Sequence, residues 1–99
     1  MEKSYKCKAC RWFDRGNGNT YHSVNVTRFL DNKTIVHPMT YGYGDHFRQT
    51  ALETMYKAGW LPKEYNKDNW YQFERDNDYP IIWEVSDGLK RDMVANGKL

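Results

Sequence analysis

Residues 5–13 and 20–30 each alternate between two sets of side chains, and this alternation constrains the fold more than any other feature of the chain. A period of two places alternate residues on opposite faces of a β-strand. The intervening residues 14–19 are rich in Asp, Asn and Gly, which tolerate the positive φ angles of tight turns. The pattern therefore predicts an antiparallel hairpin.

The two faces of this hairpin differ in chemistry. In the first strand, one face carries Tyr5, Cys7, Ala9 and Phe13, and the other carries Lys6, Lys8, Cys10 and Trp12. In the second strand, Val24, Val26 and Leu30 share a face opposite to that of Tyr21, Ser23, Asn25 and Thr27. One face is thus expected to pack in the core, and the other to carry polar and aromatic side chains.

A third strand and a helix follow the hairpin. Residues 31–33 predict a turn and residues 34–40 a strand, whose Pro38 cannot donate to a ladder and so indicates an edge. Apolar residues recur at helical spacing over residues 45–58, at Phe47, Ala51, Met55 and Ala58 with Leu52 and Tyr56 alongside. Asp45 is the expected N-cap and Gly59 the expected residue after the C-cap.

The remaining third of the chain gives weaker patterns. A short helix is predicted over residues 67–76, capped by Asn66 or Asp68 and burying Trp70 and Phe73. Residues 76–78 predict a turn and residues 79–85 a fourth strand with Ile81, Trp83 and Val85 on one face. The tail of residues 88–99 has little apolar content, and it either frays or covers the sheet.

These elements predict a single α+β domain spanning residues 1–99, in the order β-β-β-α-(α)-β. Three or four mainly antiparallel strands pack on the helix of residues 45–58. Leu, Ile, Val and Phe supply only 17 of 99 residues, but 16 aromatic residues compensate because each buries a large area. A net charge of +2 is too low for the disorder that scarce aliphatic residues would otherwise indicate.

Several functional classes are not expected. No segment is apolar enough to cross a bilayer, and the first residues lack the apolar core of a secretory signal, so a cytoplasmic location without membrane contact is expected. Cys7 and Cys10 lie three residues apart in a strand and face opposite sides. A zinc site needs four ligands in matched pairs, and His22, His37 and His46 do not supply the second pair. We therefore expect no metal and no cofactor.

No catalytic residue is expected either. His22 and Ser23 are adjacent in a strand and face opposite sides, so they cannot form a dyad. Asp45 beside His46 is explained by helix capping. The loop from Tyr41 to His46 is rich in glycine and precedes a helix, the setting in which backbone N–H groups hold phosphate, but it lacks the P-loop lysine. Capture of a nucleotide at this loop remains an alternative.

Binding of a macromolecule is the class that the residues favour. If the hairpin closes through residues 14–19, Trp12 and Tyr21 fall opposite each other on the face that also carries Lys6 and Lys8. Arg11 and Arg15 lie near the loop end of this face, and Tyr41, Tyr43 and His46 surround the turn into the helix. Aromatic residues and arginine dominate protein interfaces, whereas cations with aromatic rings also bind nucleic acid. Both partner classes stay open, as does the oligomeric state.

Four parts of the chain contain distinctive runs: Arg11-Trp12-Phe13-Asp14, the segment from Gly18 to Val24, Tyr41-Gly42-Tyr43-Gly44-Asp45 with Gln49-Thr50-Ala51, and Val85-Ser86-Asp87. Together these runs resemble a family of small bacteriophage and prophage proteins of uncharacterised function. The resemblance implies a phage or prophage accessory protein that acts in the cytoplasm of the infected bacterium, and it supplies no catalytic residues. It also implies a host protein as partner, in particular a component of antiphage immunity such as CRISPR.

Overall fold

The predicted hairpin forms the centre of the sheet. The computed structural model describes residues 3–66 and 68–99 and contains β1 (Tyr5–Asp14), β2 (Asn19–Arg28), β3 (Lys33–Tyr41), α1 (His46–Lys57), α2 (Trp70–Asp76), β4 (Ile81–Asp87) and α3 (Lys90–Asn96). The strands lie in the order β3-β2-β1-β4. β1 pairs with β2 and β2 with β3 in antiparallel fashion, whereas β4 runs parallel to β1. The predicted α+β class is confirmed, with a mixed sheet.

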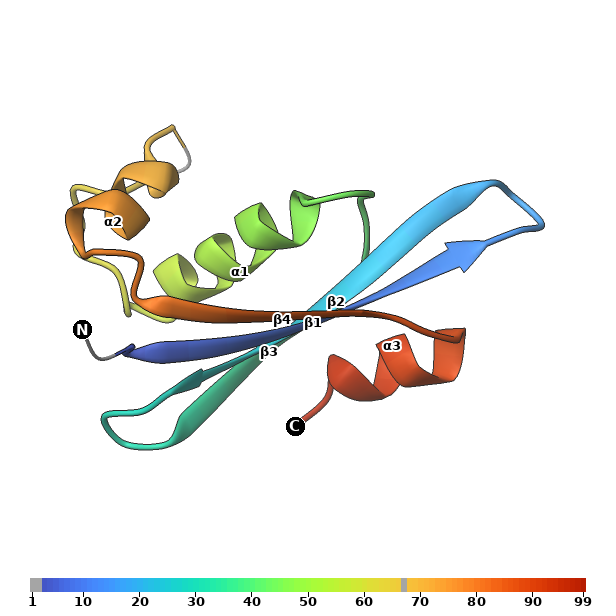
Figure 1. Ribbon diagram of the computed structural model, residues 1–99, viewed down its shortest axis with the longest axis horizontal. Helices are drawn as coiled ribbons and strands as arrows, with labels where there is room; N and C mark the ends of the chain where they lie inside the picture. Colours follow the sequence, from blue (N-terminus) through green and yellow to red (C-terminus); the bar gives the residue numbers. More distant parts are fainter. Residues whose placement is uncertain (1–2, 67) are drawn as a thin grey trace.

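Helices cover both faces of this sheet (Figure 1): α1 lies on one face and α3 on the other. The core forms between α1 and the face of β1 and β2 that the alternation marked as apolar. Its buried members include Cys7, Ala9, Val24, Val26, Phe47, Ala51, Leu52 and Met55. Tyr56 and Ala58, which were expected to join this stripe, are exposed: they lie at the C-terminal end of α1, where Ala58 is already the C-cap residue.

The hairpin extends beyond the helix that covers it, which corrects two core assignments. Phe13 shares the phase of Cys7 and Ala9 but is 54% exposed, since β1 continues past the end of β4 and past α1. Leu30 is 89% exposed because β2 ends at Arg28 and the chain turns through residues 29–32. Alternation identifies a face, but burial also requires an element that packs on that face.

The two ends of α1 differ in how they are capped. At the C-terminal end, Gly59 has φ +77°. The N–H of Gly59 bonds to the carbonyl of Tyr56, and the N–H of Trp60 bonds to the carbonyl of Met55. This is the Schellman arrangement predicted from the glycine. At the N-terminal end, Asp45 occupies the cap position but its carboxylate accepts no capping hydrogen bond. The expected capping role of Asp45 is therefore wrong.

The segment between α1 and β4 is shifted relative to the prediction. Asn69, rather than Asn66 or Asp68, precedes the first residue of α2, and Trp70 and Phe73 are buried as predicted. The predicted first residue of this helix, residue 67, lies outside the described residues. Tyr79 has φ +53° and its N–H bonds to the carbonyl of Glu74, so the chain is still turning there. β4 consequently begins at Ile81 instead of residue 79.

The C-terminal segment is ordered and covers the second face of the sheet. Met93 of α3 is fully buried, and the hydroxyl of Ser23 donates a 2.6 Å hydrogen bond to the carbonyl of Met93. Asn96 donates from its side chain to the carbonyl of Lys8. Residues 88–99 were expected either to fray or to cover the sheet, and in the structure they cover it.

Candidate functional site

Three aromatic rings cross the sheet at its hairpin end. Trp12 of β1 pairs with Tyr21 of β2, which pairs with Tyr41 of β3. The rings of Trp12 and Tyr21 stack at a centroid distance of 5.7 Å, and those of Tyr21 and Tyr41 meet edge to face at 5.9 Å. We call Trp12, Tyr21 and Tyr41 the aromatic ladder. The predicted pairing of Trp12 with Tyr21 is observed, and Tyr41 extends it to a third strand.

The ladder remains partly open because only the first residue of α3 reaches it. Lys90, the first residue of α3, places its ammonium 5.5 Å from the centroid of the Trp12 ring. Trp12 and Tyr21 are half-buried, and Tyr41 is 57% exposed. Cross-strand aromatic pairs stabilise a sheet, so part of the ladder's role is to hold the projecting hairpin together. Its exposed edges are available to a partner.

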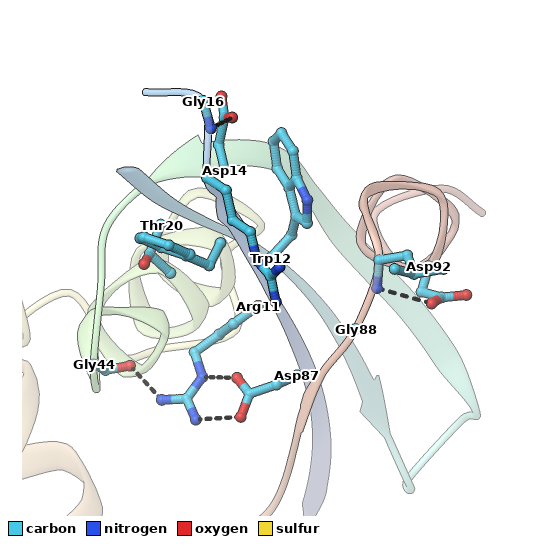
Figure 2. Close-up of a pocket in the computed structure, with 12 residues that line it drawn as sticks. Arg11, Trp12, Asp14, Gly16, Thr20, Gly44, Asp87, Gly88 and Asp92 are labelled. Carbon is cyan, nitrogen blue, oxygen red and sulfur yellow. Dashed lines mark hydrogen bonds and ion pairs between the residues drawn. The ribbon is translucent and has the colours of Figure 1, made fainter. Parts of the chain in front are cut away.

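An open groove of about 1160 Å³ lies beside the ladder, where β1 continues beyond β4 (Figure 2). Its walls are residues 11–16 of β1 and the following loop, the turn of residues 87–89, and Thr20, Gly44 and Asp92. Arg11 donates two hydrogen bonds to the carboxylate of Asp87 and a third to the carbonyl of Gly44. Arg11 therefore joins β1, the end of β4 and the loop before α1.

The predicted cations do not form one surface. Arg11 projects toward the α1 side of the sheet, with its guanidinium 6.0 Å from the Phe47 ring, and it is paired with Asp87. Lys6 is on the ladder's side of the sheet but pairs with Glu84 at 3.2 Å. Lys8 and Arg15 are exposed. The expectation that Arg11 adjoins a basic-aromatic face is wrong, because odd and even residues of β1 face opposite sides.

The groove also contains carboxylates. Asp14 accepts hydrogen bonds from the N–H of Gly16 and from the side chain of Asn17, and Asp92 accepts one from the N–H of Leu89. Together with Asp87, these groups more than balance the charges of Arg11 and Arg15. The groove is therefore not a cationic channel.

The loop from Tyr41 to His46 borders a smaller hollow of about 380 Å³ with Gln49 and Tyr71. Tyr43 is 73% exposed there, and His46 is also exposed. Gly42 has φ +159°, and a Cβ at this position would lie 2.7 Å from the His46 ring and 2.8 Å from the His22 ring. The glycine is thus required for close packing of two histidines, which accounts for it without a phosphate.

His22 and Ser23 face opposite helices, as their adjacency in the strand predicts. His22 is fully buried, with Nδ1 3.0 Å from the carbonyl of Gly42 and Nε2 2.7 Å from the hydroxyl of Thr50. A carbonyl can only accept, so Nδ1 carries the hydrogen and Nε2 accepts from Thr50. Burial lowers the pKa of His22, which keeps the ring neutral. This histidine is an internal hydrogen-bonding group.

Cys7 and Cys10 are both buried and both free, on opposite faces of β1. Burial raises the pKa of the Cys7 thiol to about 12, so the reactive thiolate is not populated near neutral pH. In the part of the chain that the structure describes, no three His, Cys, Asp or Glu side chains gather in a way that would hold a metal ion.

The sequence did not reveal α3 or the contact of Lys90 with Trp12. One local signal was present, since Asp92 lies three residues after Leu89 and accepts its N–H, a typical start of a helix. Met93 is the single buried apolar side chain of this helix, too few for a periodic pattern.

No protein-family model, curated protein or solved structure matches this chain. Among residues 3–66 and 68–99, no helix is long and apolar enough to cross a membrane.

Proposed function

We propose that this protein is a non-enzymatic binding protein whose aromatic ladder contacts a protein partner. The observation that carries the proposal is the ladder itself, three adjoining rings left partly open at the end of the sheet. Tyr and Trp are the residues most enriched at the energetic centres of protein interfaces. The exposed ring of Tyr43, which lines the same hollow as Tyr41, lies on the flanking loop and enlarges the apolar area.

A protein partner accounts for the ladder better than nucleic acid does. One side of the Trp12 ring faces Tyr21, and a Lys90 ammonium lies over the ring, so Trp12, the largest ring of the ladder, offers a base no free face on which to stack. Lys6 and Arg11 are already paired with carboxylates. A phosphate backbone would therefore meet few unpaired cations and several carboxylates.

The resemblance to bacteriophage proteins indicates which kind of partner to expect. We propose that the partner is a host protein in the bacterial cytoplasm, and that binding blocks a component of antiphage immunity. A rigid sheet end with a ready-made aromatic surface suits such a role, because a preorganised surface loses little entropy on binding.

We expect Tyr41→Ala to weaken partner binding about 5- to 30-fold, the effect of removing a hot-spot ring. The matched control is Tyr79→Ala, since Tyr79 is similarly exposed (54%) and precedes β4 at the far end of the sheet. Tagged protein is used to capture partners from bacterial lysate with and without nuclease, and the affinity of each captured protein is then measured with the purified variants.

The proposal requires a partner that survives nuclease treatment and whose affinity falls for Tyr41→Ala but not for Tyr79→Ala. Loss of all captured material on nuclease treatment would favour a nucleic-acid-binding module instead. Equal losses for the two tyrosine variants would show that the ladder is not the contact surface.

A further inference from the structure

The two edge strands of the sheet differ in how they are protected. β3 carries Pro38 and a register irregularity opposite His22–Val24, both of which discourage pairing with another chain. β4 contains neither proline nor lysine, and its register with β1 is regular over all seven residues. An unprotected edge strand is a template for adding a further strand.

The outward side of β4 presents a series of backbone groups. The N–H of Gly88 bonds to Arg11 and the carbonyl of Pro80 accepts from Tyr5, so even-numbered residues of this segment face β1. Alternation then turns the N–H and C=O groups of the odd-numbered residues away from the sheet. These residues are Ile81, Trp83, Val85 and Asp87, and within the described residues their outward backbone groups have no hydrogen-bond partner.

The side chains of β4 are also incompletely covered. α1 packs mainly on β2 and β3 and reaches β4 through Phe47 and Arg48 against the Trp83 ring, and α3 packs on β1, β2 and β3, so both helices lie mainly away from the β4 edge. Val85 is 42% exposed on one face of the strand, and Ile82 is 38% exposed on the other. A partner at this edge would bury apolar side chains on both faces as well as forming hydrogen bonds.

We propose that two copies of this chain pair through their β4 strands, antiparallel and related by a two-fold axis at Trp83. In this register Ile81 lies opposite Val85 of the second copy, and Trp83 lies opposite its own equivalent. These three hydrogen-bonded pairs supply about six backbone hydrogen bonds. The result is one continuous eight-stranded sheet in which both β4 edges are satisfied.

A second copy fits this edge because β4 is complementary to itself. The face formed by Ile81, Trp83 and Val85 is apolar at each position, so reversing the strand still places apolar opposite apolar. On the other face, Glu84 falls opposite Ile82 of the second copy, which keeps the two Glu84 carboxylates from lying directly opposite each other. A closed two-fold pairing also leaves no further edge at β4.

The test is the molar mass of the full chain, measured by size-exclusion chromatography with light scattering over a range of concentrations. We expect the wild type to approach twice 11.9 kDa. Val85→Pro removes an outward N–H without removing a bond to β1, and should raise the dimer dissociation constant about 10- to 100-fold. The matched control is Val36→Pro, the same change on the outer side of β3, which should leave the dimer intact.

The register has its own test. Ile82→Cys and Glu84→Cys chains, mixed and oxidised, should form an intermolecular disulfide far more readily than either chain alone, because these positions lie opposite each other only in the proposed pairing. If Val85→Pro fails to fold, Val85→Lys replaces it, since a lysine at an edge blocks pairing without changing the backbone. Four outcomes would each overturn the proposal. The wild type could be a monomer at all concentrations or form open-ended aggregates. Alternatively, the Val85 variants could leave the dimer intact, or Val36→Pro could weaken the dimer as much as Val85→Pro does.

Discussion

Met93→Ala should lower the free energy of unfolding by about 2–5 kcal/mol, the usual cost of truncating a fully buried methionine. Met93 is 0% exposed and is the only buried apolar side chain of α3. Its loss therefore removes most of the apolar contact that holds this helix on the sheet. Chemical denaturation monitored by circular dichroism and by tryptophan fluorescence measures the change, and hydrogen exchange across residues 88–97 shows whether α3 detaches first.

Leu89→Ala is the matched control, because Leu89 lies next to the same helix but is 56% exposed. An exposed position of this kind should change stability by no more than about 0.5 kcal/mol. If Met93→Ala lowers the free energy of unfolding as little as Leu89→Ala does, the C-terminal segment contributes little to stability. The packing of Met93 against the sheet would then be contradicted.

Acidification should destabilise the protein through His22, beginning below about pH 6.5, the ordinary pKa of histidine. The pKa of His22 is lowered in the folded state by burial, with His46 and His37 adding smaller repulsive effects. The unfolded chain therefore takes up a proton at a higher pH than the folded chain does. The contribution of His22 to the free energy of unfolding is fully present above pH 6.5 and is lost as the pH falls through the lowered pKa of the folded state.

His22→Gln provides the comparison, since glutamine offers a donor and an acceptor to Gly42 and Thr50 without titrating. Denaturant titrations of both proteins between pH 7.5 and about pH 4.5 measure the difference. We expect a steeper loss of stability with acid in the wild type than in the variant. Parallel pH profiles would show that His22 is protonated as readily inside the protein as outside it.

The local signals were sufficient for much of the fold. Alternation around a turn of Asp, Asn and Gly located β1 and β2 and predicted that Trp12 meets Tyr21. Pro38 indicated an edge strand, and Gly59 marked the end of α1. Each of these depends on backbone geometry within a few residues, where φ preferences and hydrogen-bonding capacity act directly.

The candidate site was predicted less completely. Trp12, Tyr21 and Tyr41 were all identified as candidates, but their union into one ladder depends on the register of β3, which a single sequence does not fix. Arg11 was placed near the loop end of the face that carries Trp12, whereas its guanidinium reaches Asp87, a residue 76 positions away. Lys90 was not identified at all, because its contact with Trp12 requires α3 to dock on the sheet.

The sequence by itself determined the order of the main elements, the two faces of the central hairpin and the α+β class. Only the tertiary structure decided which positions are covered and which edges stay open. α3 covers Ser23 and part of the polar face, whereas Phe13 extends past the helix that covers the rest of its face. β4 pairs in parallel with β1 and forms an open edge. Periodicity reports only that a segment has an apolar side. Burial, charge pairing and free edges depend on contacts between distant segments, and these form only when the whole chain packs.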